Sequence, residues 1–220
     1  MNILILGATG MVGQGVLREC LAAPDVERVI ALGRRPTGLK HPKLVDRVAT
    51  QLDRLPEVLG PDVEGLDACF YCLGVSSGGL DEPTYRKLTF DLTLGLARPL
   101  SERNPGITFV YVSGASTRVD SPMMWARVKG ETEAALFALP FKAAYALRPG
   151  VIAPAHGERS GVAAYRAFYL LAAPVLAGLR TLAPGLLLTT ETVGRAMLRL
   201  AREGWPTPTL EKADILKAGR

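Results

Sequence analysis

The sequence predicts an α/β fold in which helices flank a doubly wound, mostly parallel sheet. Short apolar runs alternate with longer segments whose apolar residues recur every three or four positions. Several of the short runs are apolar at every position, which is typical of strands covered on both faces. A glycine-rich turn follows the first run and opens the first helical segment.

The elements are expected in a regular order along the chain. Strands are predicted at Asn2–Leu6, Arg28–Leu32, Leu44–Ala49, Ala68–Leu73, Thr108–Val112 and Ala143–Leu147. Helices are predicted at Val12–Ala22, Glu82–Glu102, Met123–Ala138 and Thr192–Glu203. Thr189 or Thr190 precedes the last helix as its N-cap, and Glu191 places a negative charge in its first turn, where the helix dipole favours it.

The length and composition indicate one ordinary globular domain. The 220 residues are 48% hydrophobic and 21% charged, which excludes disordered and coiled-coil classes. We therefore expect residues 1–220 to form a single domain. Within it, residues 153–188 are expected to form an apolar, proline-interrupted segment on the substrate side. This segment is either a helix packed on the sheet or a lid or oligomer contact, and both alternatives stay open.

Charge and apolar patterning exclude two kinds of partner. The formal net charge is +5, but basic and acidic residues are interleaved along the whole chain. Nucleic-acid-binding proteins concentrate their charge in a patch, so no nucleic-acid binding is expected. The apolar stretch Ala167–Leu179 would span only about 20 Å as a helix, so no transmembrane segment is expected.

The three cysteines predict neither a disulfide scaffold nor a metal site. Their odd number suits a reducing compartment. Cys69 and Cys72 lie within a predicted strand and project to opposite faces, so both are expected to be buried structural thiols. Because the N-terminal residues lack an export-type signal, the sequence predicts cytoplasmic localisation.

The strongest functional signal is the glycine turn, Gly7-Ala8-Thr9-Gly10-Met11-Val12-Gly13. Between a strand and a helix, G-x-x-G-x-x-G is typical of Rossmann folds, because it allows a tight turn and close approach to a pyrophosphate. The N–H groups at the helix start favour an anion. Cofactor binding is therefore expected at Gly7, Thr9, Gly10, Met11, Val12 and Gly13.

The end of the second strand favours NADP(H) as the cofactor. An acidic residue there, about twenty residues after the glycine turn, would bind a ribose 2′-hydroxyl. The chain has Arg34 and Arg35 instead. A guanidinium pairs with a 2′-phosphate and cannot accept a hydrogen bond from a hydroxyl. NADP(H) is thus favoured, and NAD(H) is the open alternative.

Five motifs together carry a family resemblance over nearly the whole chain. They are GATGMVG, DACFYCLGVSSGG, YVSGAS, WARVKGETE and LRPGVI. With them the sequence resembles the atypical short-chain dehydrogenase/reductases, notably Tat-interacting oxidoreductase-like proteins and bacterial epimerase or dehydratase homologues. The resemblance implies that Leu73 and Gly74 lie beside the cofactor, that Ser113 approaches the nicotinamide, that Lys129 binds the nicotinamide ribose, and that Pro149 and Val151 line the nicotinamide end.

The catalytic signature departs from that family. Its Tyr-x-x-x-Lys pair is replaced by Trp125 and Lys129, which still share one helix face. The family tyrosine transfers a proton because a nearby ammonium lowers its pKa, whereas an indole N–H only donates a hydrogen bond. Candidate catalytic residues are Ser113, Trp125 and Lys129. The hydroxyls of Ser116 and Thr117 can donate hydrogen bonds, but they need a partner base to transfer a proton. Further alternatives are His156, Tyr85 and the pair Ser76–Ser77.

Two functions follow from these residues. One is an NADP(H)-dependent oxidoreductase or epimerase acting on a small apolar carbonyl compound, with a homodimer as an open alternative to a monomer. The other is a non-catalytic dinucleotide-binding protein, either a redox sensor or a protein-interaction module, which the tryptophan at position 125 favours. The fold alone does not decide between them.

Overall fold

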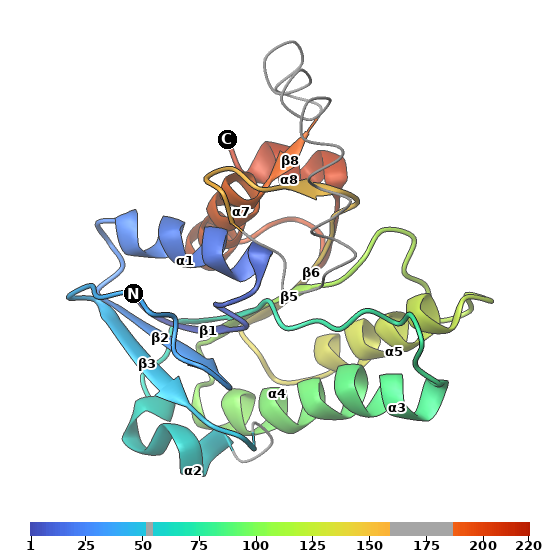
Figure 1. Ribbon diagram of the computed structural model, residues 1–220, viewed down its shortest axis with the longest axis horizontal. Helices are drawn as coiled ribbons and strands as arrows, with labels where there is room; N and C mark the ends of the chain where they lie inside the picture. The colour runs from blue at the N-terminus through green and yellow to red at the C-terminus, as the bar shows by residue number, and fades with distance from the viewer. Residues whose placement is uncertain (52–54, 159–186) are drawn as a thin grey trace.

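A seven-stranded parallel sheet forms the centre of the computed structural model, which describes residues 1–51, 55–158 and 187–220 (Figure 1). The strand order is β3-β2-β1-β4-β5-β6-β9. The strands are β1 Asn2–Leu6, β2 Arg28–Gly33, β3 Leu44–Val48, β4 Ala68–Tyr71, β5 Thr108–Val112, β6 Ala143–Arg148 and β9 Thr209–Glu211. The order reverses between β1 and β4, and ligands of such sheets bind outside the carboxyl ends of the strands at this point.

Helices cover both faces of the sheet, as the sequence predicted. In Figure 1, α1, α7 and α8 lie on one face, and α2, α3, α4 and α5 lie on the other. The helices are α1 Met11–Ala22, α2 Leu55–Leu59, α3 Glu82–Arg86, α4 Leu92–Arg103, α5 Met124–Phe137, α7 Thr190–Glu203 and α8 Lys212–Ala218. A short parallel pair, β7 Ile152–Ala153 and β8 Leu188–Thr189, forms a second sheet.

Strand β1 shows why continuous apolar runs predicted a sheet covered on both sides. Ile3 and Ile5 pack in the core that includes α1 and α7. Leu4 and Leu6 pack in the second core, with α4. All four side chains are fully buried, so each face of the strand needs apolar residues.

The observed element bounds refine several predictions. The helix expected over Glu82–Glu102 consists of α3, a wider turn at Lys87–Asp91 and α4. The last helix begins at Thr190, and Thr189 is its N-cap, since its side chain accepts a hydrogen bond from Thr192 N at 3.1 Å.

Elements α2, β9 and α8 were not predicted. Strand β9 is three residues long, and its one buried residue, Leu210, gives no periodic pattern. For residues 153–188, Ala153 ends β7 and Leu188 begins β8, but residues 159–186 lie outside the described residues. The single-domain organisation and the substrate-side role of this segment therefore stay predictions.

Cys69 and Cys72 face opposite cores, as predicted, but Cys72 follows the end of β4 and is half-buried rather than buried. Cys69 belongs to the core beside α4, while Cys72 packs against the core beside α1 and α7. All three thiols of the chain, including that of Cys20, are free. Burial raises the pKa of the Cys72 thiol to about 12 and that of Cys69 well above its ordinary value, so neither is a reactive thiolate near neutral pH.

No helix among the described residues is both long and apolar enough to cross a membrane. No group of three or more histidine, cysteine or acidic side chains in that part of the chain is placed to hold a metal ion.

Candidate functional site

The glycine turn sits between β1 and α1 at the point where the strand order reverses. Gly7 has a φ of +80°, and its carbonyl accepts a hydrogen bond from Gly10 N at 2.9 Å. A Cβ at Gly7 would lie 2.8 Å from Leu73 N, and one at Gly13 would lie 2.1 Å from Gly7 O. Both positions therefore need glycine, because strand β4 and the loop itself approach so closely.

The start of α1 presents its backbone N–H groups at this edge. Gly10 is the N-cap, no side chain caps the helix start, and no acidic residue lies in its first turn. Helix starts leave N–H groups without intrahelical partners and carry a partial positive charge. The segment Thr9–Gly13 therefore fits an anionic group such as a diphosphate.

Arg34 and Arg35 leave β2 beside the glycine turn. Leu6 pairs with Leu32 in the sheet register, so the chain exits both strands at the same edge. Both arginines are exposed, and among the described residues no carboxylate forms an ion pair with either. Thr37 anchors the loop that follows, because its N–H donates to Asp46 Oδ1 at 3.1 Å.

Ser113, Trp125 and Lys129 come together around Gly114, the second residue after β5. A Cβ at Gly114 would lie 3.1 Å from Trp125 Cζ3 and 3.8 Å from Lys129 Cδ. The Ser113 hydroxyl donates to Thr117 Oγ1 at 3.3 Å. The three candidate catalytic residues are therefore neighbours, and the alternative hydroxyl of Thr117 lies beside them.

Lys129 has a partly buried ammonium group that has few partners among the described residues. Its Nζ donates to Val112 O at a long 3.4 Å and lies 5.2 Å from the centroid of the Tyr111 ring. Burial lowers the pKa of Lys129 to about 8, and the negative charge of Glu133 opposes this shift. At neutral pH the group is still mainly protonated, with N–H donors left for a ligand.

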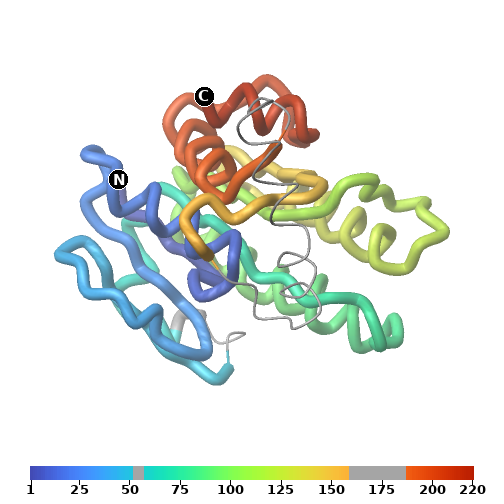
Figure 2. Tube along the Cα trace, turned by 45° about the horizontal axis from the view of Figure 1, so that its top comes forward, coloured from blue at the N-terminus to red at the C-terminus, as the bar shows by residue number. Residues whose placement is uncertain are grey.

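Leu73 and Gly74 lie between the glycine turn and Lys129. Both residues line a narrow cavity together with Lys129. Val75 and Leu88 also line it, and each is 41% exposed. Helix α3 contacts α5 on this side of the sheet (Figure 2).

Pro149 and Val151 follow β6 at the same sheet edge. The carbonyl of Pro149 accepts a hydrogen bond from Ala115 N at 3.2 Å, which holds this loop against the loop after β5. Pro149 is buried, whereas Val151 is 52% exposed. The described structure therefore gathers every expected site residue on the edge where the strands end.

The other alternative proton-transfer groups occupy different surroundings. His156 Nε2 lies 3.4 Å from Glu191 Oε2, in the first turn of α7. Tyr85 is buried in α3. Ser76 Oγ accepts a hydrogen bond from Gly78 N at 3.3 Å, within an exposed turn. Tyr85 nevertheless lies near Tyr111, whose pKa is raised mainly by burial and in smaller part by Tyr85, and the Tyr111 ring is 5.2 Å from Lys129 Nζ.

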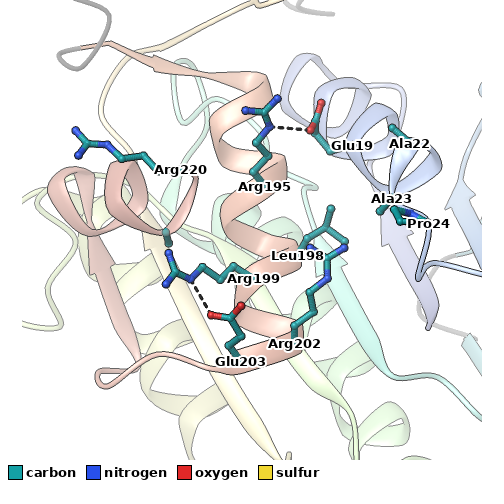
Figure 3. Close-up of a pocket in the computed structure, with 11 residues that line it drawn as sticks. Glu19, Ala22, Ala23, Pro24, Arg195, Leu198, Arg199, Arg202, Glu203 and Arg220 are labelled. Atoms are coloured by element: carbon teal, nitrogen blue, oxygen red, sulfur yellow. Dashed lines mark hydrogen bonds and ion pairs between the residues drawn. The ribbon is translucent and has the colours of Figure 1, made fainter.

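A larger pocket of about 430 Å³ lies elsewhere, between α1, α7 and α8 (Figure 3). Three of the arginines that line it have carboxylate partners: Arg195 Nε lies 3.2 Å from Glu19 Oε2, Arg199 Nε lies 3.0 Å from Glu203 Oε2, and Arg202 Nε lies 2.8 Å from Asp25 Oδ2. It is lined by the C-terminal half of α1, whereas the glycine turn adjoins the other end. We therefore place the candidate site at the sheet edge.

The sequence analysis missed Glu133 and Tyr111. A spacing signal for Glu133 exists, because it lies one helical turn beyond Lys129. Tyr111 gives no such signal, since it is one of several apolar residues of a buried strand.

No family model matches the chain. The protein FMP52, mitochondrial, of Saccharomyces cerevisiae is 36% identical over 165 residues, which cover 73% of this chain and 68% of that protein. The chain belongs to the FMP52 family. A relative of the same name from Aspergillus fumigatus is 28% identical over 235 residues, covering 99% of this chain and 98% of that protein.

Solved structures confirm the fold. The enzyme WbmF of Bordetella bronchiseptica, in complex with NAD+, has a TM-score of 0.66 at 14% identity and covers 98% of this chain and 76% of that chain. A short chain dehydrogenase family protein from Francisella tularensis has a TM-score of 0.66 at 14% identity, covering 96% of both chains.

The expected cytoplasmic localisation is wrong by this comparison, because the FMP52 relatives are named mitochondrial. The sequence argument used only the lack of an export signal and the odd cysteine count. Neither feature distinguishes the cytoplasm from another reducing compartment.

A stability measurement tests the environment of Lys129. Replacing Lys129 by Met is expected to stabilise the fold by about 1–3 kcal/mol at pH 7, because it removes a charge from a partly buried site. The native pKa of about 8 lies below the ordinary 10.5, so the cost of the charge is fully present below pH 8 and is lost as the pH rises to 10.5. The difference in the free energy of unfolding between Lys129→Met and wild type should therefore fall toward zero between pH 8 and pH 10.5.

Urea unfolding at pH 7 and pH 10 checks this result. Lys142→Met is the matched control, because Lys142 is exposed and its substitution should change stability by less than about 0.5 kcal/mol at either pH. A Lys129→Met protein no more stable than wild type at pH 7 would contradict this account of the ammonium.

Proposed function

We propose that the chain is an NADP(H)-binding oxidoreductase or epimerase of the short-chain dehydrogenase/reductase type, acting on a small apolar carbonyl compound. The observation that carries the proposal is the placement of the glycine turn and of Lys129 on one sheet edge, with Leu73 and Gly74 between them. The exposed apolar side chains of Val75 and Leu88 beside this cavity support an apolar substrate. A homodimer remains a prediction.

The residues present fit a dinucleotide along this edge. The turn from Gly7 to Gly13 would hold the diphosphate. Its glycines place no side chain over the backbone N–H groups, and no described side chain caps the start of α1. Lys129 would donate to the nicotinamide ribose, and Pro149 and Val151 would line the nicotinamide end. When bound, the nicotinamide supplies or accepts a hydride.

The reacting group would meet Ser113, Trp125 and Lys129. Ser113 can donate a hydrogen bond to a carbonyl oxygen, and Lys129 contributes positive charge. Trp125 can stack against a flat ligand, but its indole cannot transfer a proton. Acceptors such as quinones, which take a hydride without prior protonation, suit this set best.

The second candidate is a non-catalytic dinucleotide-binding protein, a redox sensor or an interaction module. The tryptophan at position 125 favours it, because the site keeps the lysine and loses the acid. NADPH binding without turnover of a panel of aldehydes and quinones would support this second function over the first.

Cofactor preference tests the role of Arg34 and Arg35. Calorimetric titration should show tighter binding of NADPH than of NADH, because the guanidinium groups would pair with the 2′-phosphate. Arg34→Asp should reverse the order, since a carboxylate repels that phosphate and accepts a hydrogen bond from a 2′-hydroxyl. The same charge change at exposed Arg98, in Arg98→Asp, should leave the order intact. Equal wild-type affinities for the two cofactors would refute the preference.

A further inference from the structure

Glu133 is a buried carboxylate of α5 that pairs with an arginine from the sheet. Its side chain is 3% exposed and that of Arg148 is 20% exposed. Arg148 Nε lies 3.2 Å from each of the two carboxylate oxygens, and Nη2 adds a further bond. The remaining guanidinium nitrogen pairs with Glu211 Oε1 at 3.1 Å. A buried ion pair adds little net stability, because the cost of desolvating the two charges offsets their attraction. We therefore expect the role of this pair to lie in the positions of the elements that it joins.

Glu133 lies on the same face of α5 as the candidate site residues. Trp125, Lys129 and Glu133 are spaced by one helical turn each, so they project from one side of α5. The negative charge of Glu133 also favours the protonated form of Lys129. Any shift of Glu133 would therefore move Lys129 and Trp125 with it.

Arg148, the other member of the pair, lies where the loop after β5 meets the loop after β6. Arg148 is the last residue of β6 and directly precedes Pro149. On either side of it, Leu147 O accepts from Ser113 N at 2.8 Å, and Pro149 O accepts from Ala115 N at 3.2 Å. The ion pair thus joins α5 to the end of β6, and the loops after β5 and β6 are hydrogen-bonded to each other at this end.

We propose that Glu133 and Arg148 are positioning residues that set the spacing between α5 and the carboxyl end of β6, and with it the width of the nicotinamide half of the dinucleotide site. The inference rests on the proposed function. The adenosine half would lie on β1, α1 and β2, and neither positioning residue belongs to those elements. The pair therefore acts on one half of the cofactor site only.

Comparing a whole cofactor with half of it tests this selectivity. Wild type and Glu133→Gln are titrated calorimetrically with NADPH and with adenosine 2′,5′-bisphosphate, which lacks the nicotinamide ribose. Glu133→Gln should raise the Kd for NADPH at least tenfold and change that for the bisphosphate less than twofold. Glu131→Gln is the control: it removes the ion pair of Glu131 with Arg86 from the same helix, and both affinities should stay within twofold.

The outcomes separate the inference from the function on which it rests. If wild type binds neither ligand, the proposed function itself fails. If wild type binds both and Glu133→Gln changes neither affinity, or weakens both equally while staying folded, the positioning role is overturned.

If the Glu133→Gln protein does not fold, a second variant tests the positioning role. Glu133→Met combined with Arg148→Met leaves no buried charge unpaired. A positioning role predicts that this protein keeps its bisphosphate affinity and loses at least tenfold in NADPH affinity. Unchanged NADPH affinity, or loss of both ligands, would overturn the role.

Discussion

Replacing Trp125 by Tyr is expected to raise NADPH-dependent reduction of carbonyl compounds by roughly 10²- to 10⁴-fold, the usual contribution of a positioned general acid. The phenol would stand one helical turn before Lys129 and beside Gly114, where the indole now lies. Lys129 is mainly protonated at pH 7, so its charge would lower the pKa of the phenol. Tyrosine is smaller than tryptophan, so no backbone shift is needed to accommodate it.

Steady-state NADPH oxidation over one panel of aldehydes and quinones measures this effect. Trp205→Tyr makes the same exchange at the other tryptophan, beside Arg199 in the C-terminal part, and should change no rate. Lower activity of Trp125→Tyr toward a substrate of the wild type would mean that Trp125 belongs to a different working site. Wild-type reduction of ordinary aldehydes at roughly 1–10³ per second would mean that another residue supplies the proton.

Replacing Gly13 by Ala is expected to weaken NADPH binding at least about 100-fold, or about 2.7 kcal/mol. The new Cβ would lie 2.1 Å from Gly7 O and 2.9 Å from Ala8 Cα, so the turn that would hold the diphosphate must move. Overpacking of this kind also costs about 1–3 kcal/mol of stability. Calorimetry with NADPH and thermal unfolding measure the two effects separately.

Gly95→Ala is the matched control for this substitution. Gly95 also lies within a helix, but a Cβ there meets nothing within 4 Å. Alanine should stabilise that position by up to about 1 kcal/mol through helix propensity and leave cofactor affinity unchanged. A Gly13→Ala protein with wild-type affinity for NADPH would place the diphosphate away from the turn.

The sequence predicted those parts of the fold and site that depend on local patterns. Ile3 to Leu6 are apolar without interruption because both faces of β1 are covered, and this was readable before the structure. The spacing of Trp125 and Lys129 likewise predicted their shared helix face. Both inferences use the short-range periodicity of one element.

Contacts between elements were harder to predict. The Glu133–Arg148 pair joins a helix to a strand, and no local pattern indicates which buried arginine a helical glutamate will meet. The hydrogen bond between Ser113 and Thr117 was not predicted for a similar reason, since it forms only through the fold of the loop after β5. Strand β9 depends on pairing with β6 rather than on its own three residues.

A crystal structure of the protein with NADPH bound tests the central claim most directly. We expect the diphosphate on the N–H groups between Thr9 and Gly13, the 2′-phosphate beside Arg34, and the nicotinamide ribose bonded to Lys129 Nζ. The nicotinamide ring should lie between Ser113 and Pro149. NADPH bound instead in the arginine-lined pocket between α1, α7 and α8, or absent from the sheet edge at saturating concentration, would contradict this account.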